Sequence, residues 1–538
     1  MLTNSKPSNS LLQISSQPSN SYKIYSQSLN DISFDGNGIK SKLLNFSQPC
    51  YIVKIDDKIG ISNHEIEDRQ QLISIPPIGL AQLGDRDFLT FHQLKYAYMA
   101  GAMAQGIASE ELVIALGKNQ LLGCFGAGGL SLNRIETAIN RIQTALPHGP
   151  FAFNLLHSPG NLAKEYSTVE LYLKKQITTI EASAFLELTE SLVYYRTAGL
   201  TLNSLNQIQI KNKIIAKISR PEVAIKFLQP PPFKILKRLL QNNLITEQQA
   251  NLAAKIPMAD DITVEGDSGG HTDNRPLVCL LPSILQLRDE VQAQYGYQSP
   301  VRIGVAGGIA TPRSALAAFM MGAAYIVTGS INQCCVEAGT SNYTKQLLAQ
   351  AEMTDVIMAP AADMFEMGVK LQVLKKGTLF PLRSQKLFEL YKTYNSIDDI
   401  PPQEREKLEN QVFRSSLDSI WRETVDYLSQ NNPEKLQQAI TYPKIKMAAI
   451  FGWYLGLSSR WAKSGEKNRE IDYQIWCSPA MGSFNSWVKN SYLAELSNRR
   501  VVDIAYHIIR GAVFLHRLQS LKIQGLQIPH SHSQYYPE

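Results

Sequence analysis

The sequence predicts a (β/α)8 barrel followed by a mainly helical C-terminal segment, and three observations support this fold class. Between residues 96 and 330, short apolar runs alternate with amphipathic stretches of helical spacing, which is typical of βα units around a parallel sheet. Eight such runs are present, enough to close a barrel, whereas fewer would leave an open sheet. Beyond residue 330, apolar residues recur at helical spacing, so this part of the chain is expected to be mainly helical.

The runs that we predict as strands are separated by stretches with the pattern of helices. One such stretch places Ile135, Ile139 and Ile142 on a single helix face, and another spans residues 314–321 and stops at Gly322. The predicted strands are residues 96–102, 121–125, 151–155, 178–182, 214–218, 262–265, 302–306 and 325–328.

The connection after the fifth predicted strand is longer than one crossover helix requires. It spans residues 219–259 and contains three consecutive prolines, beginning at Pro230. We therefore expect a helical insertion, residues 220–258, over one mouth of the barrel.

The segments that flank the barrel differ from it in composition. Residues 1–31 are rich in Ser and Asn and lack the apolar content needed to pack, so they are predicted to be disordered. Short strand-like runs in residues 32–93 predict a small N-terminal subdomain before the barrel, residues 94–330. Residues 331–520 are expected to pack on the barrel, and residues 521–538 to form a C-terminal tail.

Two patterns support helices in the C-terminal segment. An apolar stripe at helical spacing extends from Leu408 to Leu428, after the start signal Pro401-Pro402. Residues 501–515, rich in Ile, Val and Phe, predict a second helix.

Composition excludes several classes of function. The formal charge of +6 is modest for 538 residues, and the chain has no Lys/Arg-dense run of the kind that nucleic-acid binding usually leaves. The longest apolar patch, residues 447–457, is well short of the ~20 residues that a membrane-spanning helix needs. Neither nucleic-acid binding nor a membrane span is therefore expected.

The cysteines and histidines indicate a cytoplasmic protein without a metal site. The six cysteines lack the spacing of a disulfide framework, and we see no N-terminal secretion signal, so reduced thiols are expected. The adjacent Cys334 and Cys335 are predicted to be buried and structural. No HExxH motif and no Cys/His cluster with metal-ligand spacing occurs, and His530 and His532 are expected to be solvated.

The most specific motif follows the sixth predicted strand. It reads Glu265-Gly-Asp-Ser-Gly-Gly-His271-Thr. Residues just past the C-terminal end of a barrel strand face the active site, and glycines let the backbone pass close to a flat ligand. His271 would then project into the mouth with a pKa suited to proton transfer near neutral pH. The alternative is a glycine-rich turn with a capping histidine.

A second signal is a pair of glycine-containing turns after the last two strands. Ala306-Gly-Gly-Ile309 precedes a helix that begins near Thr311-Pro312, and Thr328-Gly-Ser330 ends the next strand. Loops at these positions of a barrel commonly bind phosphate through backbone N–H groups, although ordinary tight turns are the alternative. Gly126-Ala-Gly-Gly129 does not match the GxGxxG spacing of a dinucleotide fingerprint, so we interpret it as a turn at the mouth.

These motifs resemble the flavin motifs of the nitronate monooxygenase and FMN-dependent enoyl reductase superfamily. Over residues 32–518 the chain resembles more specifically the PfaD family, the stand-alone, trans-acting enoyl reductases of polyunsaturated fatty acid synthases and trans-acyltransferase polyketide synthases. It departs from the commoner superfamily form by having Asp267-Ser268 where Glu-Ala precedes Gly-Gly-His, a more polar edge that argues against plain nitronate oxidation. The PfaD-like stretches are residues 77–85, 98–104, 181–186, 358–370 and 472–482.

The resemblance implies that FMN lies across the C-terminal ends of the barrel strands, with His271 as the acid–base residue. The residues that it implies beside the isoalloxazine ring and its polar edge are Ala100, Gly101, Ala102, Asn154, Lys217, Gly269 and Gly270. The residues that it implies at the 5′-phosphate are Gly307, Gly308, Thr328, Gly329 and Ser330.

The resemblance also implies an activity. NADPH, or NADH, would reduce FMN, which would pass a hydride to the β-carbon of a 2,3-enoyl thioester on an acyl carrier protein, while His271 protonates the α-carbon. The expected partners are the carrier protein and its synthase, with a homodimer as a further possibility. Two alternatives are open: a nitronate monooxygenase that uses FMN and O2, and a non-catalytic synthase partner. The motif containing Asp363, Glu366 and Lys370 has no assigned role.

Overall fold

The structure is a computed structural model that describes residues 32–55, 57–65, 71–526, 528–529 and 533–538. The predicted disorder of residues 1–31 and the predicted solvation of His530 and His532 lie outside the described residues. The chain divides into two compact units, Met1–Pro77 and Ile78–Glu538.

Among its described residues, the first unit is a small three-stranded antiparallel sheet with one helix. Strand β1 is central, between β2 and β3, and its residues Ile52 and Val53 are fully buried. The unit ends at Pro77, earlier than the boundary expected at residue 93, because the next helix, α2, belongs to the barrel floor described below. The elements are Gly36–Leu44 (α1), Cys50–Ile55 (β1), Lys58–Ser62 (β2) and Gln71–Ile75 (β3).

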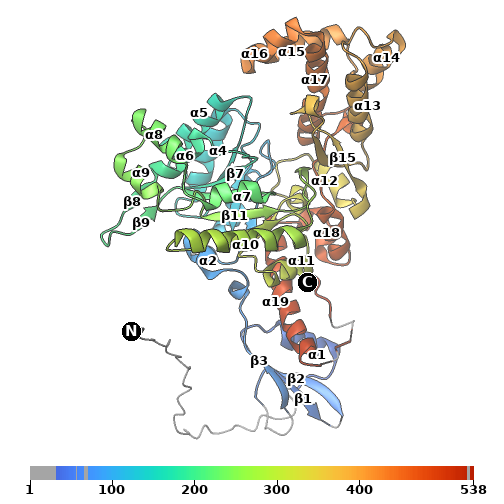
Figure 1. Cartoon of the computed structure of the whole chain (residues 1–538). Helices are drawn as coiled ribbons and strands as arrows, with labels where there is room; N and C mark the ends of the chain where they lie inside the picture. Colours follow the sequence, from blue (N-terminus) through green and yellow to red (C-terminus); the bar gives the residue numbers. More distant parts are fainter. Residues whose placement is uncertain (1–31, 56, 66–70, 527, 530–532) are drawn as a thin grey trace, which may run out of the picture. The chain divides into compact units, whose positions relative to one another are not determined.

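A closed parallel barrel forms the centre of the second unit, with strand order β10-β11-β13-β14-β4-β5-β6-β7 (Figure 1). Every neighbouring pair of strands is parallel, so all C-terminal ends meet at one mouth. The predicted barrel and each of its predicted strands are confirmed. The strands are Tyr98–Ala100 (β4), Leu122–Phe125 (β5), Ala152–Leu156 (β6), Thr179–Ser183 (β7), Lys213–Ile218 (β10), Asp261–Glu265 (β11), Arg302–Ala306 (β13) and Ile326–Thr328 (β14).

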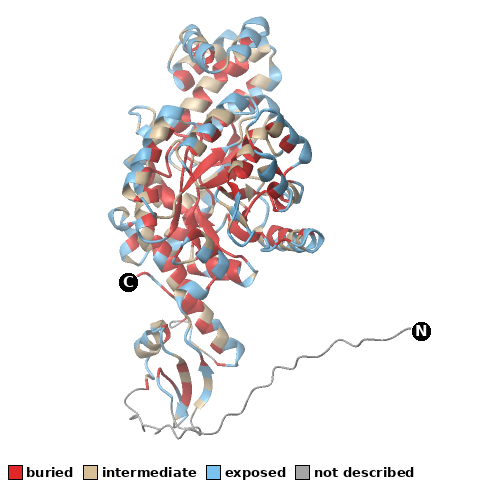
Figure 2. Ribbon diagram, turned by 90° about the vertical axis from the view of Figure 1, so that its left-hand side faces the viewer, coloured by how far each residue is buried: buried red, intermediate tan, exposed pale blue. Residues whose placement is uncertain are grey.

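A helix follows each barrel strand, and Figure 2 shows the strands buried beneath helices with exposed outer faces. Helix α4 illustrates the local cause: Ser131 caps its first turn, and Ile135, Ile139 and Ile142 are buried on one face. The helices predicted over residues 133–142 and 314–321 are confirmed as α4 and α11. The helices are Arg86–His92 (α2), Glu110–Lys118 (α3), Leu132–Ala145 (α4), Leu162–Lys174 (α5), Glu190–Ala198 (α6), Leu277–Tyr295 (α10), Pro312–Met320 (α11) and Asn342–Ala349 (α12), with the short turns Leu80–Gln82 (η2) and Ser330–Cys334 (η3).

The expected insertion is helical and consists of Pro221–Leu228 (α7), Phe233–Gln241 (α8) and Glu247–Ala253 (α9). Helices α8 and α9 pack against the outer helix α6 (Figure 1). Helix α9 also contacts strand β8, Leu200–Leu202, which forms a hairpin with β9, Ile208–Ile210. The insertion therefore lies beside α6 rather than across the strand ends, because the apolar face of α8 is buried there.

The segment after residue 330 is mainly helical, as predicted, but the apolar stripe from Leu408 to Leu428 belongs to two helices. A π-helical turn ends at Phe413, Arg414 takes a left-handed backbone conformation, and Ser416 caps the next helix. The helices are Phe380–Thr393 (α13), Pro402–Lys407 (α14), Leu408–Phe413 (η6), Leu417–Asn431 (α15), Pro433–Thr441 (α16), Pro443–Ser464 (α17), Ala480–Val488 (α18) and Val501–Ile523 (α19), with the short turns Met353–Asp355 (η4), Phe365–Met367 (η5), Glu470–Asp472 (η7), Tyr492–Ala494 (η8) and Leu496–Asn498 (η9).

A short hairpin in this segment connects it to the barrel. Its strands, Val356–Pro360 (β15) and Lys370–Leu374 (β16), form an antiparallel sheet with β12, Gly270–His271. The sequence predicted a mainly helical segment and did not indicate this hairpin, and the sheet brings the hairpin to the histidine of the glycine-rich motif.

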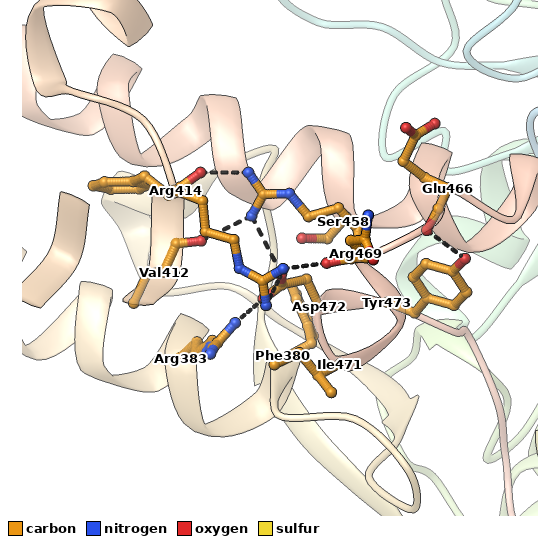
Figure 3. A network of polar contacts seen from close by, with 12 residues as sticks. Phe380, Arg383, Val412, Arg414, Ser458, Glu466, Arg469, Ile471, Asp472 and Tyr473 are labelled. Carbon is orange, nitrogen blue, oxygen red and sulfur yellow. Dashed lines mark hydrogen bonds and ion pairs between the residues drawn. The ribbon is translucent and has the colours of Figure 1, made fainter. Parts of the chain in front are cut away.

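A buried carboxylate organises the helical part of this segment (Figure 3). The fully buried Asp472 accepts from Tyr454 Oη at 2.9 Å and from Arg469 Nη1 at 3.2 Å, and it also pairs with Arg383. Arg469 in turn donates to the carbonyls of Val412 and Phe413 at the end of η6. This network fixes the start of residues 473–478, which run from the helices back to the barrel.

Described residues of the predicted C-terminal tail contact the helices of this segment. Helix α19 continues to Ile523, and the buried Tyr535 donates or accepts a 2.7 Å hydrogen bond with Nδ1 of His507. Trp487 Nε1 donates to the carbonyl of Tyr535 at 2.9 Å. Among the described residues, no helix combines the length and the apolar character needed to cross a membrane.

The floor of the barrel, at the N-terminal strand ends, carries a buried ionic cluster. Asp261, the first residue of β11, lies 2.8 Å from Nε2 of His92 and receives two bonds from Arg302, of 2.6 and 3.0 Å. All three side chains are buried. His92 belongs to α2, so this helix closes the floor of the barrel.

Candidate active site at the mouth of the barrel

The C-terminal strand ends bring most of the predicted site residues together. Strand register aligns Ala100 with Thr328, and Ser183 with Lys217, at this edge of the barrel. The glycine turns that follow β13 and β14, and the loop that follows β11, open at the same mouth.

His271 is held at the mouth by the hairpin of the C-terminal segment. In the antiparallel pair β12–β16, Gly270 lies opposite Gln372 and His271 opposite Leu371. A Cβ on Gly269 would lie 2.9 Å from the backbone nitrogen of Cys477, so only glycine lets residues 473–478 pass this closely. The glycines that the resemblance implied beside a flavin ring thus also form the contact with the C-terminal segment.

The imidazole of His271 forms an ion pair with Asp363, which lies in the loop between β15 and β16. Nε2 and the carboxylate Oδ1 are 3.1 Å apart, and both side chains are about half exposed or more. Burial by itself would lower the pKa of His271, but the contact with Asp363 and its charge outweigh this effect and raise the pKa above 6.5. The pKa of Asp363 is lowered below 3.8, because its pairing with His271 outweighs its burial.

The unusual Asp267-Ser268 pair is also held by the hairpin. Gln372 Nε2 donates to Asp267 Oδ1 at 2.6 Å and to the Ser268 carbonyl at 2.8 Å. The hydroxyl of Ser268 is buried with no hydrogen-bond partner among the described residues. Asp267 and Ser268, the polar pair noted in the sequence, therefore lie where the barrel loop contacts the hairpin.

A lysine and two carboxylates lie under the mouth. Lys217 Nζ donates to Glu265 Oε1 at 3.0 Å, and the buried Glu181 accepts from the Ala102 amide at 3.1 Å. Burial would lower the pKa of Lys217, but Glu265 and Glu181 raise it above its usual value, so the ammonium stays charged. Burial raises the pKa of Glu181, although the charge of Lys217 opposes the shift. Glu181 Oε1 is buried without a geometric hydrogen-bond partner among the described residues.

Two of the residues predicted to contact the cofactor, Asn154 and Thr328, form hydrogen bonds with neighbouring strand ends. Asn154 Nδ2 donates to the Glu181 carbonyl at 3.1 Å and to Ser183 Oγ at 2.9 Å. The Thr328 hydroxyl lies 2.6 Å from Tyr98 Oη and accepts from Asn332 Nδ2 at 2.9 Å. Both groups stabilise the strand ends beneath the mouth.

The glycine turns after β13 and β14 leave backbone donors free. Gly308 has φ +73°, and at Gly308 and Gly329 no atom lies within 4 Å of the position a Cβ would take. In the described part of the chain, the amides of these two glycines have no protein acceptor. Gly307 packs against the carbonyl of Asp267. Open space with free N–H groups fits a phosphate, so these turns could hold the 5′-phosphate of FMN.

Ser330, which the resemblance implied at the phosphate, bonds to the C-terminal segment. Its Oγ accepts from the Ser478 amide at 3.2 Å and lies 3.1 Å from Ser478 Oγ. Gln333 Nε2 donates to the carbonyl of Trp476 nearby. Residues 473–478 thus form one wall of the mouth.

Sequence reasoning missed the contribution of the C-terminal segment to this site. Asp363, Gln372 and Ser478 all contact residues of the barrel mouth. Asp363 and Ser478 lie in the long PfaD-like stretches, but the sequence offers no physical reason to place them at the active site. Cys334 and Cys335 are buried, as predicted. Among the described residues, no group of three or more His, Cys, Asp or Glu side chains could hold a metal ion.

Three known families match parts of the chain. The family described as nitronate monooxygenase matches residues 87–388, more than half of the chain. The fatty acid synthase subunit PfaD N-terminal domain matches residues 26–70. The inserted helical domain of acyl-carrier-protein S-malonyltransferase matches residues 394–473, the helices around the Asp472 network.

Curated relatives are similar along most of this chain. A polyunsaturated fatty acid synthase protein of Thraustochytrium sp. is 46% identical, with 90% of this chain and 33% of that protein covered. Polyketide biosynthesis protein PksE of Bacillus subtilis is 45% identical, with 90% of this chain and 63% of that protein covered. The chain thus spans less than two thirds of either relative.

A solved structure is similar over its whole length. The enoyl reductase domain of MlnA, from the macrolactin biosynthesis cluster of Bacillus amyloliquefaciens, is 40% identical with a TM-score of 0.78. The match covers 82% of this chain and 100% of that domain.

Proposed function

Since the chain belongs to the PfaD family, within the nitronate monooxygenase superfamily of oxidoreductases, we propose that it is an FMN-dependent enoyl reductase. Its substrate would be a 2,3-enoyl thioester on an acyl carrier protein of a polyketide or polyunsaturated fatty acid synthase, and its reductant NADPH or NADH. The observation that carries the proposal is that the protonatable His271 and the open glycine turns lie at the same mouth of the barrel. The MlnA domain, an enoyl reductase by name, supports it.

The residues at the mouth fit FMN. The free amides of Gly308 and Gly329 would hold the phosphate, and the charged Lys217 would face the polar edge of the ring. When bound, FMN supplies the hydride that the β-carbon receives, after its reduction by the nicotinamide.

The protein's own contribution to the chemistry is a proton. As the β-carbon gains a hydride, the α-carbon gains negative charge and must be protonated. The pKa of His271 is raised by its contact with Asp363, which favours the protonated state that a general acid needs. A proton leaves the imidazolium, a C–H bond forms at the α-carbon, and the neutral imidazole is reprotonated from water.

An anaerobic absorbance experiment tests this function. The purified protein should be yellow, should bleach when NADPH or NADH is added, and should regain its colour when a crotonyl thioester on a carrier protein follows. The control is the same reduced protein given the saturated butyryl thioester, which cannot accept a hydride and should leave it bleached.

Two results would contradict the proposal. Failure to bleach, combined with consumption of a nitronate and O2, would identify a nitronate monooxygenase, which the family match also permits. A colourless protein with no affinity for added FMN would identify a non-catalytic synthase partner.

A further inference from the structure

The loop between β15 and β16 has a shape that directs one carboxylate to His271. Met364 has φ +60°, a left-handed conformation that non-glycine residues seldom adopt. It turns the chain so that Asp363 meets His271 at 3.1 Å while Phe365, two residues on, is buried. Strain of this kind persists only where the surroundings impose it, and it occurs often at functional sites.

The loop is fastened to helix α13 and to the helices of residues 394–473. Phe365 packs against Phe451 of α17 and Tyr391 of α13, with ring centroids 6.3 and 5.3 Å apart. Glu366 Oε1 lies 3.0 Å from Lys435 Nζ of α16. At the base of the loop, the Ala361 amide donates to the Val369 carbonyl at 2.9 Å. The backbone of Asp363 is therefore fixed on one side by the base of the loop and on the other by Phe365 and Glu366, although its own side chain is exposed.

The geometry points to Asp363 as a positioning residue that orients His271 and determines which of its nitrogens gives up the proton. This inference rests on the proposed role of His271 as the acid. A carboxylate can only accept, so it favours a proton on the adjacent Nε2. Nδ1 is then the nitrogen that donates: its N–H bond breaks, a C–H bond forms on the substrate, and the ring is left neutral with Nε2–H still facing Asp363. The helices that match the malonyltransferase insertion would support the catalytic histidine through this loop.

The charges around His271 support this role. Asp363 faces it from the hairpin, Glu265 from β11 and Lys217 from β10. Burial and Lys217 lower the pKa of His271, whereas Asp363 and Glu265 raise it, and Asp363 has the larger effect of the two carboxylates. Without Asp363, the pKa of His271 should therefore fall, and the proton should be lost at a lower pH.

The test measures the protonation of His271 without any substrate. Diethyl pyrocarbonate modifies only the neutral imidazole, so its rate at His271, followed by peptide mass spectrometry across pH, gives a midpoint. We expect Asp363→Asn to move this midpoint to lower pH and Asp363→Glu to restore much of it. The control is Asp273→Asn, which removes a carboxylate two residues from His271 in the sequence that pairs with Arg220 instead, and it should leave the midpoint unchanged.

Activity provides the second readout. The Asp363→Asn variant should lose kcat, with little change in KM, by less than the roughly 10²–10⁴-fold that removal of a general acid causes. The kcat should also begin to fall at a lower pH than in the unaltered protein, and Asp363→Glu should recover part of it. A merely structural role would lower activity equally at every pH.

An unchanged modification midpoint in Asp363→Asn would overturn the inference, as would a shift of the same size in the Asp273→Asn control. If the unaltered protein reduces no enoyl thioester, the proposed function fails. The modification midpoints would still decide whether Asp363 controls the proton on His271.

Discussion

The barrel carries a histidine–carboxylate pair at each end, and the two pairs behave in opposite ways. At the floor, His92 and Asp261 are 2.8 Å apart with side chains 2% and 0% exposed. At the mouth, His271 and Asp363 are 3.1 Å apart with side chains 48% and 64% exposed. Burial, then Lys213 and Arg302, lower the pKa of His92 despite Asp261, whereas the pKa of His271 is raised.

The difference shows that burial and the third charge, rather than residue type, decide what such a pair does. At the floor, burial lowers the pKa of His92. Arg302 also pairs with Asp261, so the cluster holds three elements together. At the mouth no arginine competes for Asp363 among the described residues, and water reaches both side chains. The first pair stabilises the fold, and the second can exchange a proton.

The largest effect on stability is expected at the floor. Asp261→Asn removes the charge that compensates the buried Arg302, and breaking a buried ion pair in this way costs about 3–5 kcal/mol. Urea unfolding followed by circular dichroism should therefore give a much lower midpoint. The matched control is Asp398→Asn, at a carboxylate 82% exposed and paired with Arg405, where about 0–1 kcal/mol is expected. If the urea midpoint fell equally in the two variants, the buried pair at the floor would contribute no more to stability than an exposed pair.

A smaller effect is expected at the mouth, where it should appear in binding. Gly308→Ala adds a Cβ at φ +73°, with a strain of about 1–2 kcal/mol, next to the amides proposed to hold the phosphate. The control is Gly296→Ala at φ +62°, at the end of α10 and with equally open space. Both variants should lose similar stability, but only Gly308→Ala should retain less FMN after gel filtration. Equal retention in both would argue against a phosphate site there.

Much of the barrel could be predicted from the sequence because its signals are local. Apolar runs, helix periodicity and glycine turns each depend on residues close in the chain, and each predicted strand is present. The place of the insertion beside α6 and the inclusion of α2 in the floor could not be predicted in the same way. Both depend on contacts between distant residues, such as His92 with Asp261.

Only the part of the site that the barrel supplies could be predicted from the sequence, because contacts between distant residues leave no local pattern. His271, Lys217 and the phosphate turns follow strands, so their positions come from barrel geometry. The other half comes from antiparallel pairing between β12 and β16, which joins residues about a hundred positions apart. No residue pattern near Asp363 or Gln372 indicates that this segment pairs with β12.

The role of His271 is tested most sharply by the turnover of His271→Ala, measured together with its bound flavin. We predict that the variant retains FMN, because no phosphate contact is removed, and that kcat for enoyl thioester reduction falls by roughly 10²–10⁴-fold. Unchanged turnover with flavin bound would contradict the central claim that the histidine at the mouth supplies the proton.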